Sequence, residues 1–282
     1  MLVLVALWGF NNVAIKLAAP GMSPVMQMGV RFTIAAVLLL LWARWRNISL
    51  FSRDGSAVGG LLAGALFAAE FAAIAIGLNY TSAARMAVFV NLAPLWTLLG
   101  LAVFVKAERP TSMQWLGVIV GFAGVAFALS EGFGISDRAT LMGDALGVLA
   151  SLLWGFTTVV IRASQLAHAP AAKTLMYQLG VAAPVLLIAS PLMNEPGVIA
   201  LTALTIASIA YQSVIVAFCS FLMWFWMLTR YSAGGLAVFT FLTPLVGVAA
   251  GAIVLGDPIS ARLFWGMAAV ALGIALVVNR RA

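Results

Sequence analysis

The chain has 282 residues, of which 64% are hydrophobic and only 8% charged, and its formal net charge is +7. A soluble protein is about 45–50% apolar and about 25% charged, and a compact soluble fold cannot hide this much apolar surface. Disordered chains are apolar-poor and charge-rich, so disorder is excluded as well. The basic residues stand singly between apolar runs, unlike those of nucleic-acid-binding faces. We therefore expect membrane lipid around the chain and no nucleic-acid partner.

Apolar runs of the length that crosses a bilayer follow one another along the chain. A spanning helix needs about 20 apolar residues, and these runs lack the alternation of a membrane barrel strand. Turn residues such as Pro20 and Gly21, or Asp257 and Pro258, separate them. The first charge is Lys16, so the first run resembles a retained helix more than a signal peptide. The runs lie at 1–18, 23–43, 57–79, 82–104, 112–130, 140–162, 172–192, 204–228, 233–255 and 261–279.

Lysine and arginine predict the orientation, because cytoplasmic loops accumulate these residues. With the N-terminus inside, the inner side holds Arg44, Arg46, Arg53, Lys106, Arg109, Arg162, Lys173, Arg230, Arg280 and Arg281. The outer side holds Lys16, Arg85, Arg138 and Arg262, and Arg31 lies within a run. This bias predicts that both termini face the cytoplasm.

The two halves of the chain resemble each other. WGFNNVAIK at 8–16 returns as WGFTTVVIR at 154–162, and SAARMAVFVNLAP at 82–94 returns as SAGGLAVFTFLTP at 232–244. At an offset of 149 residues, Glu108, Gly117 and Gly124 recur as Asp257, Gly266 and Gly273. We interpret this as two five-helix repeats, residues 1–135 and 136–282. Because five is odd, the second repeat enters the membrane inverted, which is a plan of secondary transporters with a midplane substrate site.

Three of these segments resemble one family in particular. They are the opening Trp8-Gly9-Phe10, the segment 82–94, and Glu108 followed by Thr111, Gln114 and Gly117. Together they resemble the EamA-type drug/metabolite transporter superfamily, over nearly all of both halves. The resemblance implies an all-α polytopic membrane protein, with ten transmembrane helices in a 5+5 inverted repeat, that exports small metabolites through a central cavity. Within the superfamily the chain is most similar to YddG-type exporters of aromatic and other neutral amino acids. The repeat partner of Glu108 is Asp257, in a Gly-Asp-Pro turn. A role of Glu108 in its loop is therefore not carried over to Asp257.

Polar and aromatic residues inside the runs mark candidate binding positions, because they are costly in lipid unless they face protein or a cavity. Trp8, Asn11 and Asn12 share one helix face, and their repeat partners share another. Two indole walls with amide and hydroxyl groups between them suit a small amphipathic solute. The alternative is interfacial tryptophan with helix–helix hydrogen bonds, and we favour the cavity. The partners are Trp154, Thr157 and Thr158.

Four further runs add candidate substrate-binding residues, although core packing explains any single aromatic equally well. Pro94 and Pro244 each remove a backbone hydrogen bond and permit a bend. Tyr80 and Tyr211 fit an interfacial anchor as well as a cavity. The candidates are Phe67, Glu70, Phe71, Phe89, Asn91, Ser220, Trp224, Phe239, Thr240 and Thr243.

Glu70 is the acidic residue deepest within a run, and Arg31 is about equally deep, each roughly 12 Å from the outer end. One interpretation is an ion pair between neighbouring helices, or a role in orienting substrate. The other is proton coupling of export through Glu70. We favour the first.

No sequence motif indicates enzymatic chemistry. The chain has no Gly-Lys-Ser/Thr phosphate loop, nucleophile elbow or His-Glu-x-x-His helix. Cys219 and His168 are its only cysteine and histidine, so we expect no metal site and no cofactor. The Gly117/Gly121 and Gly247/Gly251 pairs favour tight packing inside the chain over a dimer seam, so a monomer is our expectation.

The sequence thus predicts a multi-pass secondary transporter of a bacterial inner membrane. It would export small amphipathic metabolites, with aromatic and other neutral amino acids first, by alternating access. One alternative is a multidrug or quaternary-ammonium exporter, for which an unpaired Glu70 would be expected. A membrane-embedded enzyme or a structural protein is a weaker alternative from another class.

Overall fold

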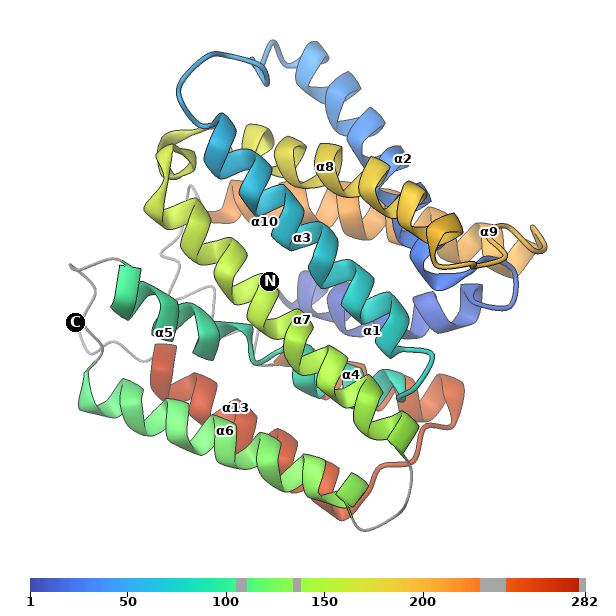
Figure 1. Ribbon diagram of the computed structural model, residues 1–282, viewed down its shortest axis with the longest axis vertical. Coiled ribbons are helices and arrows are strands. Elements are labelled where there is room, and N and C mark those ends of the chain that lie inside the picture. The colour runs from blue at the N-terminus through green and yellow to red at the C-terminus, as the bar shows by residue number, and fades with distance from the viewer. Residues whose placement is uncertain (105–110, 134–137, 229–241, 279–282) are drawn as a thin grey trace. The chain divides into compact units, whose positions relative to one another are not determined.

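The computed structural model describes residues 1–104, 111–133, 138–228 and 242–278, and helices dominate all four ranges (Figure 1). Outside the helices, Met22 and Val198 form an isolated antiparallel bridge. The helices are α1 (Leu2–Ala18), α2 (Pro24–Trp45), α3 (Ala57–Gly77), α4 (Ala83–Val90), α5 (Ala93–Phe104), α6 (Ser112–Phe133), α7 (Arg138–Ala163), η1 (Gln165–His168), α8 (Ala171–Leu192), α9 (Ala203–Ala210), η2 (Tyr211–Ser220), α10 (Phe221–Leu228), α12 (Leu242–Ala250), η3 (Gly251–Leu255) and α13 (Ala261–Val278).

Among the described residues, six helical segments are long and apolar enough to cross a membrane. Shorter apolar helices at Leu2–Ala18, Ser112–Ala128, Leu242–Leu255 and Ala261–Leu276 accompany them. This confirms the prediction of an all-helical, membrane-type protein, because length and hydropathy are what a bilayer requires of a helix. The six are Pro24–Trp45, Ala57–Gly77, Ala83–Phe104, Arg138–Ala163, Ala171–Leu192 and Ala203–Trp224.

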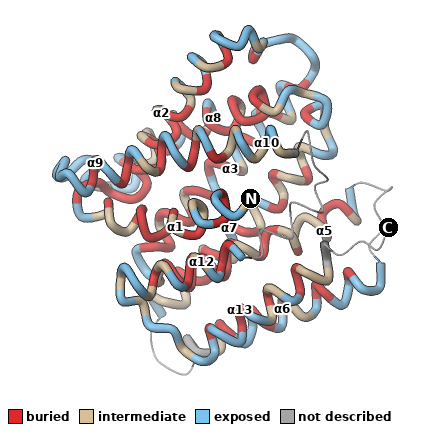
Figure 2. The backbone as a smooth tube through the Cα atoms, turned by 180° about the vertical axis from the view of Figure 1, so that it is seen from behind, coloured by how far each residue is buried: buried red, intermediate tan, exposed pale blue. Residues whose placement is uncertain are grey.

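The surface of these helices is apolar, as lipid-facing helices require. Large hydrophobic side chains point outward on several elements, and Val58, Leu192 and Ile253 are 80%, 77% and 83% exposed. Exposed and buried positions alternate along most helices in Figure 2. In water such a surface would aggregate, whereas in a bilayer it needs no cover.

Three of the predicted runs are not uninterrupted α-helices in the described residues, and one of them, 233–255, ends in the π-helix η3. The run 82–104 breaks at Asn91 and Leu92, between α4 and α5, and Pro94 stands in the first turn of α5. A proline lacks the N–H that would continue the helix, which explains the break. The run 204–228 changes to π-helix over η2. π-Helical segments are rare and often accompany functional sites.

The described contacts divide the chain into two compact units, each built from both halves of the sequence. Unit 1 comprises 1–13, 76–155 and 231–282, and unit 2 comprises 14–75 and 156–230. The predicted boundary between the repeats, at residues 135 and 136, rests on sequence similarity, and the division into two units does not test it.

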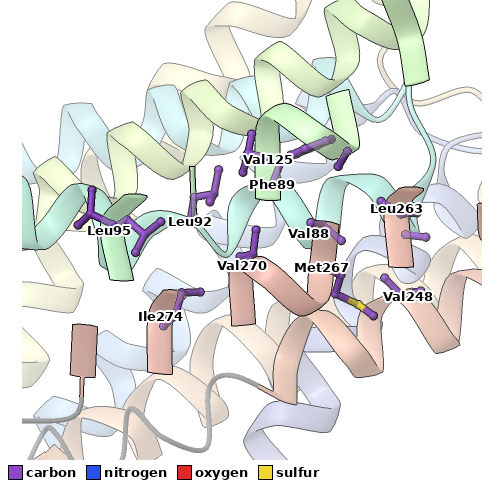
Figure 3. Packing of buried hydrophobic residues seen from close by; sticks show 13 residues of the cluster. Val88, Phe89, Leu92, Leu95, Val125, Val248, Leu263, Met267, Val270 and Ile274 are labelled. Carbon is purple, nitrogen blue, oxygen red and sulfur yellow. The ribbon is translucent and has the colours of Figure 1, made fainter. Parts of the chain in front are cut away.

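Unit 1 has an apolar core formed by α4, α5, α6, α12 and α13 (Figure 3). Helices α6 and α13 approach each other closely at their glycines. A Cβ added to Gly273 would lie 2.5 Å from the carbonyl oxygen of Gly117, and one added to Gly124 would lie 2.9 Å from that of Gly266. Such backbone contact requires glycine. The core residues are Ala84, Val88, Phe89, Leu92, Leu95, Val118, Val125, Ala128, Val248, Leu263, Met267, Val270 and Ile274.

Both small-residue motifs of unit 1 pack inside the chain. Gly121 contacts Leu95 and lies against the backbone of Gly273. A Cβ added to Gly247 would lie 2.5 Å from the Cβ of Ala87 on α4. These glycines therefore serve helix packing within one chain, the use we favoured from the sequence.

Unit 2 is organised around the packing of α2 on α8, with η2 and α9 also on α2. The start of α2 is held by the loop that follows α8. Both carboxylate oxygens of Glu195 accept backbone N–H groups at this end, from Val25 and Met26 at 3.2 Å each. The N-cap residue Ser23 provides no side-chain cap of its own, so a distant carboxylate satisfies the free amides.

Candidate functional site

Two residues of opposite charge, on α2 and α3, lie buried within unit 2, in addition to Lys173 at the start of α8. Arg31 of α2 is 1% exposed and Glu70 of α3 is 4% exposed. Their opposite charges interact electrostatically, and the neutral phenol of Tyr211, the first residue of η2, lies near Arg31. A buried charge is costly unless other groups compensate it. We call Arg31, Glu70 and Tyr211 the charged cluster.

Four phenylalanine rings pack on one another beside this cluster, and two of them, Phe32 and Phe71, contact Arg31. The ring centroid of Phe32 lies 5.1 Å from that of Phe67 and 4.8 Å from that of Phe71. The Phe67 ring reaches Phe71 at 4.7 Å and Phe221 of α10 at 6.5 Å. We call these rings the phenylalanine cage. Aromatic pairs at such distances stabilise one another beyond their burial.

The guanidinium of Arg31 stands over two rings of the cage. Its Cζ lies 5.0 Å from the centroid of Phe32 and 4.9 Å from that of Phe71, and its Nη1 donates to the sulfur of Met28 at 3.9 Å. The ring faces carry negative potential, so these contacts support a cation away from water. The site thus combines one charge of each sign with an apolar aromatic wall.

Two glutamines extend the polar array along α2. Gln27 precedes Arg31 by one turn, and its Nε2 donates to the carbonyl oxygens of Met22 at 2.8 Å and Ile15 at 3.2 Å. The Nε2 of Gln212 donates to Oε1 of Gln27 at 3.3 Å. Both glutamines are fully buried. Sequence reasoning missed both glutamines. A signal was available for Gln27, because Gln27 and Arg31 are four residues apart in an apolar run and therefore share a helix face.

Two acceptors in this region lack a donor. Oε2 of Glu70 and Oε1 of Gln212 are buried and have no hydrogen-bond partner among the residues that the structure describes. More than about 90% of buried polar groups in proteins are hydrogen-bonded. An unmet buried acceptor costs about 1–3 kcal/mol, so both atoms mark places where a donor is expected.

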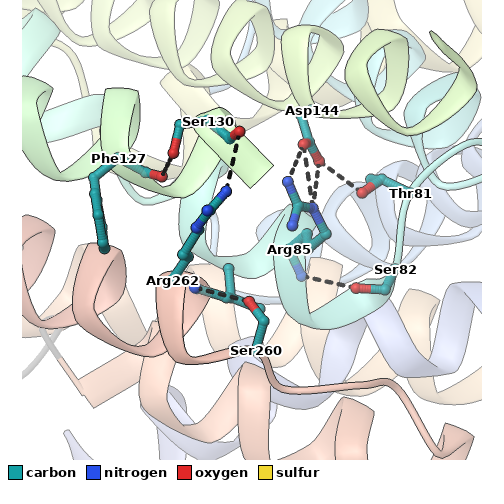
Figure 4. A network of polar contacts seen from close by, with 9 residues as sticks. Thr81, Ser82, Arg85, Phe127, Ser130, Asp144, Ser260 and Arg262 are labelled. Carbon is teal, nitrogen blue, oxygen red and sulfur yellow. Dashed lines mark hydrogen bonds and ion pairs between the residues drawn. The ribbon is translucent and has the colours of Figure 1, made fainter. Parts of the chain in front are cut away.

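Unit 1 holds a second polar network, at the start of α4 (Figure 4). The Arg85 guanidinium binds the carboxylate of Asp144 on α7 through Nε at 3.1 Å and Nη2 at 2.5 Å, and Thr81 Oγ1 donates to the same carboxylate at 2.7 Å. Ser82 caps α4 by accepting from the backbone N–H of Arg85, while Asp257 accepts from that of Ala84 at 3.0 Å. Several contacts thus fix this helix end. Asp144 was not singled out from the sequence, although it interrupts an apolar run.

A third polar contact lies at the start of α8 and involves the loop between α2 and α3. Nζ of Lys173 donates to Asp54 at 2.7 Å and to the carbonyl oxygen of Ser52 at 2.6 Å. The hydrogen bond from Lys173 holds the pKa of the Asp54 carboxyl below its ordinary value, and hydrogen bonds from Ser56 act in the same direction. A buried lysine here depends on a carboxylate supplied by a loop.

The predicted site residues in unit 1 occupy different environments. Asn11 and Asn12 of α1 are buried, whereas Trp154 of α7 is 39% exposed. Phe89 lies in the apolar core of unit 1, as expected if this side chain serves core packing. Nδ2 of Asn91 donates to the carbonyl oxygen of Ala87 at 2.7 Å, next to the helix break. Trp8 lies on α1, Thr243 and Pro244 are buried on α12, and Pro94 is half-buried on α5.

In unit 2 the structure brings Phe67, Glu70 and Phe71 together with Arg31, as described above. Ser220 is buried and donates to a carbonyl oxygen one turn earlier, which is a local contact. Trp224 is half-buried on α10, and Thr157 (buried) and Thr158 (half-buried) lie on α7. Phe239 and Thr240 lie outside the described residues.

No cluster of three His, Cys, Asp or Glu side chains suited to a metal ion occurs within the described ranges.

Helices of this length and hydropathy, with charges buried among them, define a polytopic helical membrane protein. Residues 1–130 and 141–279 each match the model of the EamA-like transporter family. The chain belongs to that family.

Relatives extend along nearly the whole chain. The uncharacterized transporter YvbV of Bacillus subtilis is 29% identical over 97% of this chain and 88% of its own length. Proteins named probable amino-acid metabolite efflux pump, from Salmonella typhimurium and Escherichia coli, are 24% and 23% identical over 97% of this chain and 91% of their own length. A solved crystal structure with 18% identity covers 98% of this chain and 94% of its own, with a TM-score of 0.69, and shows the same fold.

Proposed function

We propose that this chain is a secondary active transporter, not an enzyme, and that it exports small amphipathic metabolites by alternating access. Its ten transmembrane helices would form two inverted five-helix repeats. The observation that carries this proposal is a set of contacts that recurs between the two halves of the sequence.

The first recurring contact involves the glycine after each repeated tryptophan. A Cβ on Gly9 would lie 2.7 Å from Cβ of Val246, and one on Gly155 would lie 2.6 Å from Cβ of Trp96. The sequence repeat relates Gly9 to Gly155 and Trp96 to Val246. Each half thus contributes the same kind of contact to the other half.

The second recurring contact is reciprocal. Gly117 and Gly124 correspond to Gly266 and Gly273, and the observed neighbours are Gly117 with Gly273 and Gly124 with Gly266. When residue i meets the equivalent of j and j meets the equivalent of i, a two-fold axis relates the two segments. Helices in equivalent positions also pack on each other, as α6 on α13 and α4 on α12 in unit 1 and α2 on α8 in unit 2.

A two-fold relation between halves with an odd number of spans supports transport by rocking of one bundle against the other. The break at Asn91 and Leu92 before Pro94, with Pro244 at the related position of α12, supplies positions where a helix can bend. In this proposal the basic loops and the start of α8 with Lys173 face the cytoplasm. The protein is multi-pass in a bacterial inner membrane, as its bacterial relatives suggest.

The favoured substrates are aromatic and other neutral amino acids. The printed names of two relatives refer to amino-acid metabolite efflux. Glu70 is accompanied by the opposite charge of Arg31, which suits a zwitterion better than a lone cation. The phenylalanine cage is the observation that favours the second candidate, a multidrug or quaternary-ammonium exporter, because rings bind such cations.

We propose that aromatic residues hold the apolar part of the solute while amides, hydroxyls and Glu70 meet its polar groups. The described residues proposed for this role are Trp8, Asn11, Asn12, Phe67, Glu70, Phe71, Asn91, Trp154, Thr157, Thr158, Ser220, Trp224 and Thr243. Phe89 belongs to the same proposed set and packs in the core of unit 1.

Counterflow in proteoliposomes tests the proposal. Vesicles loaded with one unlabelled compound from a panel of amino acids, nucleosides and organic cations receive the labelled compound outside, and protein-free vesicles serve as the control. We expect transient accumulation of phenylalanine and leucine. Exchange of organic cations without exchange of any amino acid would select the second candidate, and no exchange of any kind would refute the transporter.

A further inference from the structure

The end of α2 and the loop that follows it carry three exposed arginines. None of the guanidinium groups of Arg44, Arg46 and Arg53 forms a hydrogen bond or an ion pair with a residue that the structure describes. Figure 2 shows this end of α2 and its loop in the colour of exposed residues. We propose that these arginines bind the headgroup phosphate of an anionic phospholipid whose acyl chains lie along α2.

The positive charge of this segment is not compensated from within. Asp54 is the only acidic residue in the segment 44–56, and its carboxylate already accepts from Nζ of Lys173 at 2.7 Å. The same Nζ donates to the carbonyl oxygen of Ser52 at 2.6 Å. Arg53 therefore lies between two residues that are both held by Lys173, and its charge is left over for a ligand from outside the chain.

The two arginines at the end of α2 stand on a helix end that is held by backbone hydrogen bonds. The N–H of Ile48 donates to the carbonyl oxygen of Ala43 at 2.9 Å, as at a Schellman-type helix end. The N–H of Asn47, where φ is 53° and the chain turns, donates to the carbonyl oxygen of Arg44 at 3.3 Å. These bonds occupy carbonyl oxygens that would otherwise repel an anion near Arg44 and Arg46.

The face of α2 next to these arginines is suited to an acyl chain. Val37, Leu41 and Trp45 recur every four residues, so they share one helix face, and they are 49%, 61% and 76% exposed. From Val37 to Trp45 this face is about 12 Å long, which is most of the roughly 15 Å of hydrocarbon in one leaflet. Tryptophan is common where hydrocarbon meets headgroups. The guanidinium of Arg46 lies 5.9 Å from the ring centroid of Trp45, so the apolar face leads directly to the cations.

Charge and shape both favour an anionic headgroup. A guanidinium donates two parallel N–H bonds to a phosphate, which makes arginine a good phosphate ligand. Each basic residue near an anionic lipid surface strengthens binding roughly fivefold. A zwitterionic headgroup lacks this gain, because its own ammonium is repelled by the arginines. In the proposed topology this end of α2 faces the cytoplasm, where the leaflet carries anionic lipids.

Lipid binding by the purified full chain in a neutral detergent at low salt tests the inference, with Tm followed as lipid is added. The lipids are dioleoylphosphatidylglycerol and dioleoylphosphatidylcholine, and the soluble probes are glycerol phosphate and inorganic phosphate. We expect phosphatidylglycerol to bind at least twentyfold more tightly than phosphatidylcholine. The soluble phosphates should leave Tm unchanged at the same concentrations, because they have no acyl chain to lie along α2. The measurement does not depend on transport.

Arg44→Gln/Arg46→Gln should bring the affinities for the two lipids within fivefold of each other. Its Tm without lipid should equal that of the unmodified protein, because both side chains are exposed. The matched control is Arg138→Gln/Arg262→Gln, which removes the same charge from exposed positions of unit 1 and should keep the full preference. The inference is overturned if both lipids bind equally to the unmodified protein, if Arg44→Gln/Arg46→Gln keeps the preference, or if the control loses it to the same extent. Stabilisation by inorganic phosphate equal to that by phosphatidylglycerol would also overturn it, because the site would then serve a free anion.

Discussion

Replacing Asp144 by asparagine should destabilise unit 1 more than any surface change of charge. The side chain of Asp144 is fully buried and that of Arg85 is 11% exposed. The substitution keeps the shape and the acceptor for Thr81 but removes the charge that compensates Arg85. Removing one partner of a buried ion pair costs about 3–5 kcal/mol, because the remaining charge stays buried.

This free energy corresponds to a large thermal shift. In proteins of about 150–250 residues, 1 kcal/mol moves Tm by about 2–4 °C, so Asp144→Asn should lower Tm by roughly 6–20 °C. The double variant Arg85→Met/Asp144→Leu should recover most of the loss, because no unpaired charge remains. Recovery stays incomplete by about 1 kcal/mol, since Thr81 loses its acceptor.

Unfolding followed by intrinsic fluorescence in detergent measures these shifts. Arg262→Gln is the control, because the hydrogen bond of Arg262 to the carbonyl oxygen of Ser130 is exposed at 3.3 Å, and it should change Tm little. The reasoning is refuted if Asp144→Asn lowers Tm no more than Arg262→Gln, or if the double variant is less stable than the single one.

Three further outcomes are expected. Gly273→Ala should lower Tm by the equivalent of about 1–3 kcal/mol, because the new Cβ would lie 2.5 Å from a backbone oxygen of α6. Gly180→Ala is the control and should be neutral or stabilising, because the nearest atom to its new Cβ lies 3.9 Å away. Equal changes of Tm for the two variants would contradict this packing. The pKa of Asp54 is lowered by Lys173, so this contact stabilises the fold above the ordinary pKa of about 3.9 and loses its effect as the pH falls through the lower folded value. A pH series of Tm should therefore separate wild type from Asp54→Asn at neutral pH, with the gap closing only in strong acid; closure near neutrality would argue against it. Gln27→Leu should cost about 1–3 kcal/mol, because two buried carbonyl oxygens lose their donor, and an unchanged Tm would show that other donors replace it.

The positions of the helices were accessible to sequence reasoning. The runs around residues 24–45 and 171–192 were predicted within a few residues of α2 and α8, because a bilayer demands long apolar segments and the chain provides few others. The bend near Pro94 follows from the missing N–H of proline. The π-helical stretch η2 was not predicted, since a shift from i→i+4 to i→i+5 hydrogen bonds has no local sequence signal.

The candidate site was only partly accessible. Glu70 and Arg31 stood out because charges deep in an apolar run are rare. Gln212 did not, because its partner Gln27 lies 185 residues earlier in the chain. The neighbours of Phe89 in the core of unit 1 were not accessible either, since an aromatic ring suits a core or a binding site and the sequence carries no sign of which residues it meets.

The sequence by itself determined that this protein is suited to a membrane, where its helical segments lie, and that the sequences of its two halves resemble each other. Each of these depends on properties that are local to one segment or shared by two aligned segments. Only the tertiary structure decided which polar groups meet, such as Arg85 with Asp144 and Glu195 with the start of α2. In a bilayer almost every surface is apolar, so hydrophobicity does not select neighbours; hydrogen bonds, charge and close packing at glycine select them, and these depend on distances between residues far apart in the chain.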